Sequence, residues 1–132
     1  MAVTTWLVDK SALVRIPASP DSSLWSDRID RGLVRITSLT RLEIGFSAHS
    51  GADLRGAAMR PPSALMALES LTPAVESRAL DVQQRLTDIG LHRAPSIPHL
   101  VIAATAELAR LTVLHLDKGF DLIASVTAQP TD

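Results

Sequence analysis

The chain has no cysteine and no tyrosine among its 132 residues, and aromatic side chains make up only 3% of it. Without cysteine it forms no disulfide and offers no thiolate to a metal ion, as is typical of a reducing cytosol. The scarcity of aromatic rings argues against recognition of single-stranded nucleic acid by base stacking. No apolar run approaches the length of about 18 residues that a membrane span requires, and no basic segment with an apolar core opens the chain. We therefore expect a soluble, cytoplasmic protein.

The charge of the chain is nearly balanced, with a formal net charge of −1. This balance gives no overall attraction to nucleic acid, so any such binding must rest on a local site. Apolar residues make up 46% of the sequence, and alanine and leucine dominate over aromatic residues. This composition favours helices packed on a modest sheet over an all-β sandwich. The length fits a single domain over residues 1–132, with a frayed end at residues 129–132.

Short apolar runs alternate with helical patterns along the chain. We predict strands at residues 6–8, 33–36 and 113–116, and a very short strand near residues 71–72. Pro61 and Pro62 must break a helical pattern, which resumes through residues 65–68. Strands that alternate with helices favour right-handed crossovers and a parallel sheet with helices on both faces. The sequence therefore predicts an α/β fold of three layers, α/β/α, with a short and mainly parallel central sheet.

Three acidic residues follow predicted strands at similar local positions. Asp9 ends the first strand, Asp117 ends the fourth, and Glu43 lies one turn into the helix after the second strand. In a parallel sheet the strand ends share one edge, so these groups can converge there. Converging carboxylates repel each other unless a cation lies between them, and hard oxygen ligands select Mg²⁺ or Mn²⁺. Such an ion can activate water and stabilise the oxygens at a phosphorus under in-line attack.

Each acid also has a purely structural explanation. Asp9 and Asp117 are good N-cap residues for the helices that follow them. Thr40 and Glu43 have the spacing of a capping box, in which the glutamate returns to the backbone N–H of the cap residue. The joint placement of the acids favours a metal site, but the sequence leaves both interpretations open.

Four segments, taken together, resemble the PIN-domain ribonucleases, and specifically the VapC-type toxins of bacterial toxin–antitoxin pairs. The segments are LVDKSA at 7–12, LTRLEI at 39–44, IPHLVIAATA at 97–106 and VLHLDKGFD at 113–121. The resemblance covers essentially the whole chain and follows the order and spacing of that family. It implies a PIN-like domain, an endoribonuclease that depends on Mg²⁺ or Mn²⁺, and inhibition by a small VapB-type antitoxin. It also implies a homodimer or a toxin–antitoxin hetero-oligomer, with Asp9, Glu43 and Asp117 as catalytic, metal-binding residues.

The chain departs from the family pattern at three positions. His99 stands where the family has an aspartate, Gly119 where it often has a second aspartate, and Lys10 where it has threonine or serine. His99 has three possible roles: a histidine without a ligand role, a metal ligand that favours Mn²⁺ over Mg²⁺, or a replacement that disables catalysis. The last possibility leaves a PIN-like module that only binds an antitoxin or RNA, which is the alternative function.

Cations near the acids are the candidates for holding the phosphates of an RNA substrate. Lys10 and Lys118 adjoin Asp9 and Asp117 in the sequence. The hydroxyl of Ser11 could orient water or a phosphate oxygen, or it could simply cap a helix. Residues 54–68 could line a groove for an amphipathic antitoxin helix. His115 alternates with leucines, as expected of a packed or edge histidine on a strand.

Overall fold

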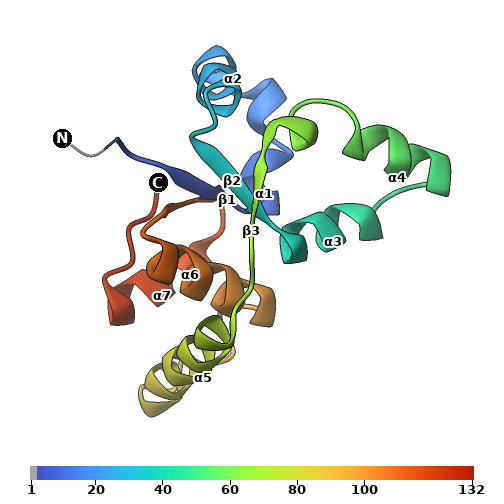
Figure 1. The fold of residues 1–132 in the computed structure, drawn as a ribbon. Coiled ribbons are helices and arrows are strands. Elements are labelled where there is room, and N and C mark those ends of the chain that lie inside the picture. The colour runs from blue at the N-terminus through green and yellow to red at the C-terminus, as the bar shows by residue number, and fades with distance from the viewer. Residues whose placement is uncertain (1–2) are drawn as a thin grey trace.

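The computed structural model describes residues 3–132, and a parallel sheet lies at its centre (Figure 1). The strands are β1 (Trp6–Val8), β2 (Val34–Thr37), β3 (Ala67–Glu69) and β4 (Thr112–Leu114), in the spatial order β3-β2-β1-β4. Every pairing between neighbouring strands of this sheet is parallel. The residues that follow β1, β2 and β4 therefore lie along one edge of the sheet, which we call the carboxyl edge. The predicted α/β class with a parallel sheet is confirmed.

Helices cover both faces of the sheet and enclose two hydrophobic clusters. Leu7 of β1 packs with α5 (Pro73–Asp88), α6 (Ile97–Ala109) and α7 (Lys118–Thr127). Trp6 and Val8 of the same strand pack on the opposite face with α1 (Lys10–Leu13), η1 (Ile16–Ala18) and α2 (Ser22–Asp30). Successive side chains of a strand point to opposite faces, which explains how so short a strand joins both clusters. Figure 1 shows α2 on one side of the sheet and α5 to α7 on the other.

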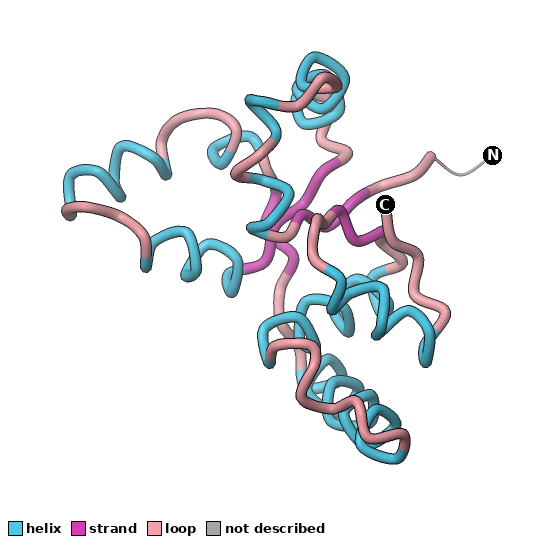
Figure 2. Tube along the Cα trace, turned by 180° about the vertical axis from the view of Figure 1, so that it is seen from behind, coloured by secondary structure: helices cyan, strands magenta, loops and turns pink. Residues whose placement is uncertain are grey.

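The helices α3 (Ser38–Phe46) and α4 (Gly51–Ala58) extend away from the sheet as an arm (Figures 1 and 2). The helix α4 ends before Pro61 and Pro62, as predicted, and a cis peptide bond joins these prolines. The predicted resumption of a helix over residues 65–68 is wrong. A short 3₁₀ turn, η2 (Ser63–Leu65), leads directly into β3, where residue 68 pairs with β2.

The third strand lies earlier than residues 71–72, where the sequence analysis placed it. Thr72 instead caps α5, and its hydroxyl accepts the backbone N–H of Val75 at 3.3 Å. The observed strand pairs Thr37 of β2 with Glu69, whose Oε2 lies 2.8 Å from Arg35 Nε. The position of so short an edge strand depends on its pairing with β2, and the local sequence contains no information about that pairing.

Residues 129–132 run beside β4, so the prediction of a frayed end is wrong. Thr131 forms a parallel bridge with Val113. The indole N–H of Trp6 donates to Asp132 Oδ2 at 3.0 Å, and Gln129 is buried. The partners of this segment lie in β4 and, for Trp6, near the other end of the chain, and local composition contains no sign of them.

None of the helices within residues 3–132 combines the length and the apolar character needed to cross a membrane.

Candidate functional site at the carboxyl edge

Asp9 leaves β1 at the carboxyl edge and begins α1. Its side chain is buried, with the residue 4% exposed. Oδ2 accepts the backbone N–H of Ser11 at 3.0 Å, and the backbone N–H of Asp9 donates to the carbonyl of Leu114 at 2.9 Å. One carboxylate oxygen therefore caps the helix while the other stays outside the cap. Capping and a ligand role, which the sequence presented as alternatives, are compatible in this geometry.

Asp117 has the same construction after β4. Its Oδ1 accepts the backbone N–H of Gly119 at 2.8 Å and caps α7. Its own backbone N–H donates to Nδ1 of His115 at 3.1 Å, which fixes the turn between β4 and α7. The second oxygen, Oδ2, faces the imidazole of His99. β1 and β4 are hydrogen-bonded neighbours, so these two caps lie side by side at the carboxyl edge.

Glu43 lies within α3 and takes no part in capping that helix. The N-cap is Thr37, whose hydroxyl accepts the backbone N–H of Thr40 at 3.1 Å. The capping box between Thr40 and Glu43, which the spacing allowed, is therefore wrong. Within residues 3–132, no hydrogen-bond partner reaches the buried Oε1 of Glu43. A buried carboxylate oxygen without a partner is costly and needs an explanation.

The electrostatic surroundings of Glu43 point toward the other site residues. Burial is the largest cause that raises the pKa of Glu43, and the negative charge of Asp9 raises it further. His99 and Lys10 act in the opposite direction and lower the pKa of this carboxyl. The charges of Asp9, His99 and Lys10 therefore all act on the Glu43 carboxyl. A divalent cation would relieve the repulsion between the two carboxylates.

His99 lies in the first turn of α6, with its side chain largely buried. Ser96 caps this helix: its hydroxyl accepts the backbone N–H of His99 at 3.3 Å, and its own N–H donates to His99 Nδ1 at 3.4 Å. This reciprocal pair is a capping box with histidine in the place of glutamate. The other ring nitrogen, Nε2, lies 3.5 Å from Asp117 Oδ2.

The predicted substrate-binding residues differ in their surroundings. The ammonium of Lys10 donates to the carbonyl of Glu43 at 3.3 Å and to Ser47 Oγ at 2.8 Å, which ties α1 to α3. Ser11 Oγ accepts the backbone N–H of Leu116 at 3.0 Å. Lys118 is exposed at the start of α7. All of them adjoin the carboxyl edge, and their contact with a substrate stays a prediction.

The acids meet as two close groups. Asp9 interacts with Glu43 through charge, and Asp117 lies against His99. Across residues 3–132, no set of three or more His, Cys, Asp or Glu side chains is spaced to hold a metal ion directly. An ion such as Mg²⁺, which commonly binds through one or two carboxylates and keeps several of its waters, does not need such a set. The partnerless oxygen of Glu43 and the purely oxygen donors of the three acids agree with that ion type.

Asp121 and Phe120 contact the two histidines near the carboxyl edge, and neither residue was predicted from the sequence. Nε2 of the buried His115 lies 3.4 Å from Asp121 Oδ1, so His115 links α7 to the turn that carries Asp117. The ring of Phe120 packs between two imidazoles, with centroids 4.5 Å from His99 and 5.0 Å from His115. The expectation of a packed histidine at 115 is confirmed. The spacing of His115 and Asp121 was visible in the sequence, but only the turn of α7 brings them together.

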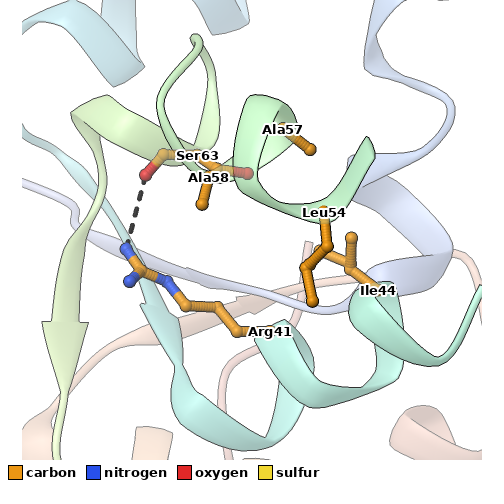
Figure 3. Close-up of a pocket in the computed structure, with 6 residues that line it drawn as sticks. All are labelled: Arg41, Ile44, Leu54, Ala57, Ala58 and Ser63. Carbon is orange, nitrogen blue, oxygen red and sulfur yellow. Dashed lines mark hydrogen bonds between the residues drawn. The ribbon is translucent and has the colours of Figure 1, made fainter. Parts of the chain in front are cut away.

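A separate apolar pocket lies in the arm, away from the carboxylates. Figure 3 shows it between α3 and α4, where Arg41 reaches the backbone carbonyl of Ser63 at 3.4 Å. Its other lining residues are Ile44, Leu54, Ala57 and Ala58. A shallower hollow beside it is lined by apolar side chains of α3, α4 and β3, namely Leu42, Phe46, Leu54 and Leu68. The groove predicted over residues 54–68 is also lined by residues of α3, which the sequence did not indicate.

Comparison with known proteins identifies the family. No family model matches the chain. The chain is 60% identical over 127 residues to ribonuclease VapC2 of Mycobacterium tuberculosis (strain CDC 1551 / Oshkosh), an alignment that covers 96% of this chain and 90% of that protein. The chain belongs to the VapC ribonuclease family. The predicted resemblance is thereby confirmed.

Other relatives agree with this VapC assignment. Ribonuclease VapC21 of M. tuberculosis (strain CDC 1551 / Oshkosh) is 38% identical over 130 residues, which cover 98% of this chain and 93% of that protein. The structure of a DNA-bound VapBC from Salmonella typhimurium superposes with a TM-score of 0.76 at 15% identity, covering 98% of both chains. At that identity the structural likeness shows the fold alone, and it agrees with the PIN-like fold inferred from the sequence.

Proposed function

We propose that this VapC-family chain is an endoribonuclease toxin that depends on Mg²⁺ or Mn²⁺. The observation that carries the proposal is the buried, partnerless Oε1 of Glu43, held beside the charge of Asp9. Folding alone gives no reason to bury an acid next to a second acid, because both burial and repulsion oppose its ionisation. A divalent cation supplies that reason. Names such as ribonuclease VapC2, given to close relatives, support hydrolysis of RNA as the reaction.

The ion would be held by Asp9, Glu43 and Asp117, directly or through its bound waters. Capping leaves one oxygen of each aspartate outside the cap. When bound, such an ion activates a water molecule and stabilises the oxygens around the phosphorus under attack. The fourth residue of the candidate site, His99, contributes no negative charge. Hence the site carries fewer charges for a second ion than a site with a carboxylate at that position.

The neighbouring residues of this chain would hold the substrate and balance charge. Lys10 offsets part of the negative charge of Glu43 and fixes α3 against α1. Ser11 Oγ already accepts one backbone N–H, so its hydroxyl hydrogen can still donate to a phosphate oxygen. Lys118 is exposed beside Asp117 and would attract a phosphate on the side of the scissile bond opposite to the phosphate bound by Ser11.

We also propose that a VapB-type antitoxin covers the arm and neutralises the enzyme. The structural neighbour from Salmonella typhimurium is named VapBC, which is the name of a toxin–antitoxin pair. This name supports an antitoxin as the partner. The arm exposes Leu42, Phe46, Leu54 and Leu68 around one hollow, and we call these residues the arm patch. An amphipathic helix would lay its apolar face on such a surface. Assembly would be a homodimer or a hetero-oligomer with the antitoxin, in the cytoplasm.

The test is cleavage of total RNA by the purified chain with Mn²⁺, with Mg²⁺ and with chelator. We expect cleavage only with an ion, and a fall to about 1% of the wild-type rate in Asp9→Asn, which keeps the helix cap but weakens the ligand. Glu76→Gln, an exposed acid on α5, serves as the matched control and should cleave like wild type. Unchanged cleavage by Asp9→Asn would reject the metal site.

The alternative function, a module that binds an antitoxin or RNA without cleaving it, makes a different prediction. Such a module would show no ion-dependent cleavage under any of these conditions and would still bind its antitoxin.

A further inference from the structure

The hydrogen bonds of His99 fix which ring nitrogen carries the proton. The backbone N–H of Ser96 points at Nδ1 from 3.4 Å, so Nδ1 must present its lone pair. In a neutral imidazole the proton then belongs to Nε2. That nitrogen lies 3.5 Å from Asp117 Oδ2, so the ring directs an N–H at the carboxylate.

A glycine makes room for this ring. A Cβ atom added to Gly119 would lie 3.0 Å from His99 Nδ1, 3.1 Å from Asp117 Oδ1 and 3.3 Å from the Cα of Pro95. Real Cβ contacts are rarely that short, so a side chain at 119 would require the imidazole, the Asp117 carboxylate or the Pro95 backbone to shift by a few tenths of an ångström. The ordinary backbone angles of α7 do not require glycine there, since Gly119 is not among the described residues with positive φ.

The ring is also held from the side. Its centroid lies 4.5 Å from that of Phe120, and only 14% of the His99 side chain is exposed. The hydrogen bond from Ser96, the close approach to Gly119 and the contact with Phe120 together restrain the imidazole. A metal ion cannot bind Nε2 while that atom carries the proton. Moving the proton to Nδ1 would set two N–H groups against each other and remove the second hydrogen bond of the capping box.

We propose that His99 is a positioning residue: it directs Nε2–H at Asp117, does not bind the metal ion, and packs closely over Gly119. This inference rests on the proposed nuclease function, because Asp117 needs exact placement only if it holds an ion. His99 would then act on the ion only through the Asp117 carboxylate.

Histidine ¹⁵N NMR tests the tautomer directly, without activity. We expect the Nε2–H form of His99 in the free protein, and the same form after saturation with Mg²⁺. His49→Gln, which removes an exposed histidine, should leave the His99 signals unchanged and help to assign them. An Nδ1–H tautomer in the ion-bound protein would overturn the proposal.

The ion preference of the site separates positioning from ligation. His99→Gln keeps an amide N–H near the position of Nε2 but is a poor ligand for transition ions. We expect its ratio of Mn²⁺ to Mg²⁺ affinity, measured by calorimetry, to equal that of wild type. An imidazole ligand favours Mn²⁺ over Mg²⁺, so a fall of about tenfold in this ratio would show that His99 binds the ion. His99→Ala should lose about tenfold in kcat, and His99→Gln should restore most of it.

The pairing of His99 with Gly119 is tested by combining two substitutions. Gly119→Ala alone should lower the Tm and disturb the His99 signals, whereas in the His99→Ala background the same change should lower the Tm less. Some loss will remain there, because the Pro95 backbone is also close. Gly56→Ala, where the nearest atoms belong to the flexible side chain of Arg60, is the control and should not lower the Tm. Equal losses in both backgrounds would refute the pairing.

These readouts distinguish the failure of this inference from failure of the proposed function. If wild type cleaves RNA and the Mn²⁺ to Mg²⁺ ratio falls in His99→Gln, the nuclease stands and the positioning role is wrong. If no variant cleaves RNA or binds an ion, the proposed function is wrong, and the positioning role, which rests on it, is wrong as well.

Discussion

The side of the molecule formed by α5, α6 and α7 buries its apolar side chains, whereas the arm formed by α3 and α4 exposes some of them. Where α5, α6 and α7 pack on the sheet, Leu86, Ile102 and Phe120 are at most 1% exposed. On the arm, Leu42 is 71% exposed and Phe46 is 93% exposed. A contiguous exposed apolar patch in a folded protein marks an interaction site more often than a fault of packing. The difference indicates that the side formed by α5, α6 and α7 supplies stability, while the arm supplies a surface for a partner.

Glu43 connects the two sides. It belongs to α3 of the arm, yet its carboxyl faces Asp9 and its backbone carbonyl accepts the ammonium of Lys10. The position of the arm therefore sets the position of one acid of the candidate site. An antitoxin on the arm patch would lie one helix face away from the reacting groups.

The largest stability effect is expected on the packed side. Ile102→Ala removes a fully buried side chain and should lower the free energy of unfolding by about 3 kcal/mol, because a cavity remains in the α5–α7 cluster. Urea denaturation of the free chain measures this loss. The matched change on the arm, Phe46→Ala, should alter stability by less than about 0.5 kcal/mol. Similar losses in the two variants would contradict the division between the sides.

The largest binding effect is expected on the arm. Phe46→Ala should weaken binding of the cognate VapB-type antitoxin by about 2 kcal/mol, or about thirtyfold, because the aromatic side chain of the arm patch is lost. Titration calorimetry measures the affinity. Leu80→Ala removes a similarly exposed apolar side chain from α5 and should bind normally. An equal loss in both variants would place the antitoxin elsewhere.

A smaller effect is expected where α1 meets the turn after β4. Ser11→Ala removes the acceptor for the backbone N–H of Leu116 and should cost about 1 kcal/mol of stability. Ser125→Ala, whose hydroxyl contacts only its own helix at Leu122, should cost less. If Ser11→Ala is as stable as wild type, the link between α1 and this turn contributes nothing.

The smallest effect is a dependence of stability on pH caused by Glu43. In the unfolded chain its carboxyl loses the proton near the ordinary pKa of 4.5, whereas the folded pKa is higher. Between these values the folded state binds more protons, so stability falls as the pH rises through the window. Without divalent ions, Glu43→Gln should be more stable than wild type above the folded pKa, and this gain should vanish below 4.5. Thermal denaturation across this range measures the difference; a gain that persists in acid would assign it to another cause.

Much of the fold could be predicted because its signals are local. The apolar run of β1 and the acid after it, the break at Pro61 and Pro62, and the alternation of strands and helices all depend on neighbouring residues. The same reasoning failed for β3 and for residues 129–132, since these segments owe their conformation to strands that are distant in the sequence. The arm patch was half predicted, because Leu42 and Phe46 join it only through the packing of α3 against α4.

The sequence by itself determined the VapC family, the parallel α/β layout and the acids that reach the carboxyl edge, because strand order and residue spacing carry that information. Only the tertiary structure decided which atoms those acids commit to capping and which oxygen of Glu43 is left without a partner. It also decided how His99 is oriented, because the orientation of the ring depends on Ser96, on Phe120 and on the absence of a side chain at Gly119. Such contacts join separate elements, and their energies depend on distances that a one-dimensional pattern does not contain.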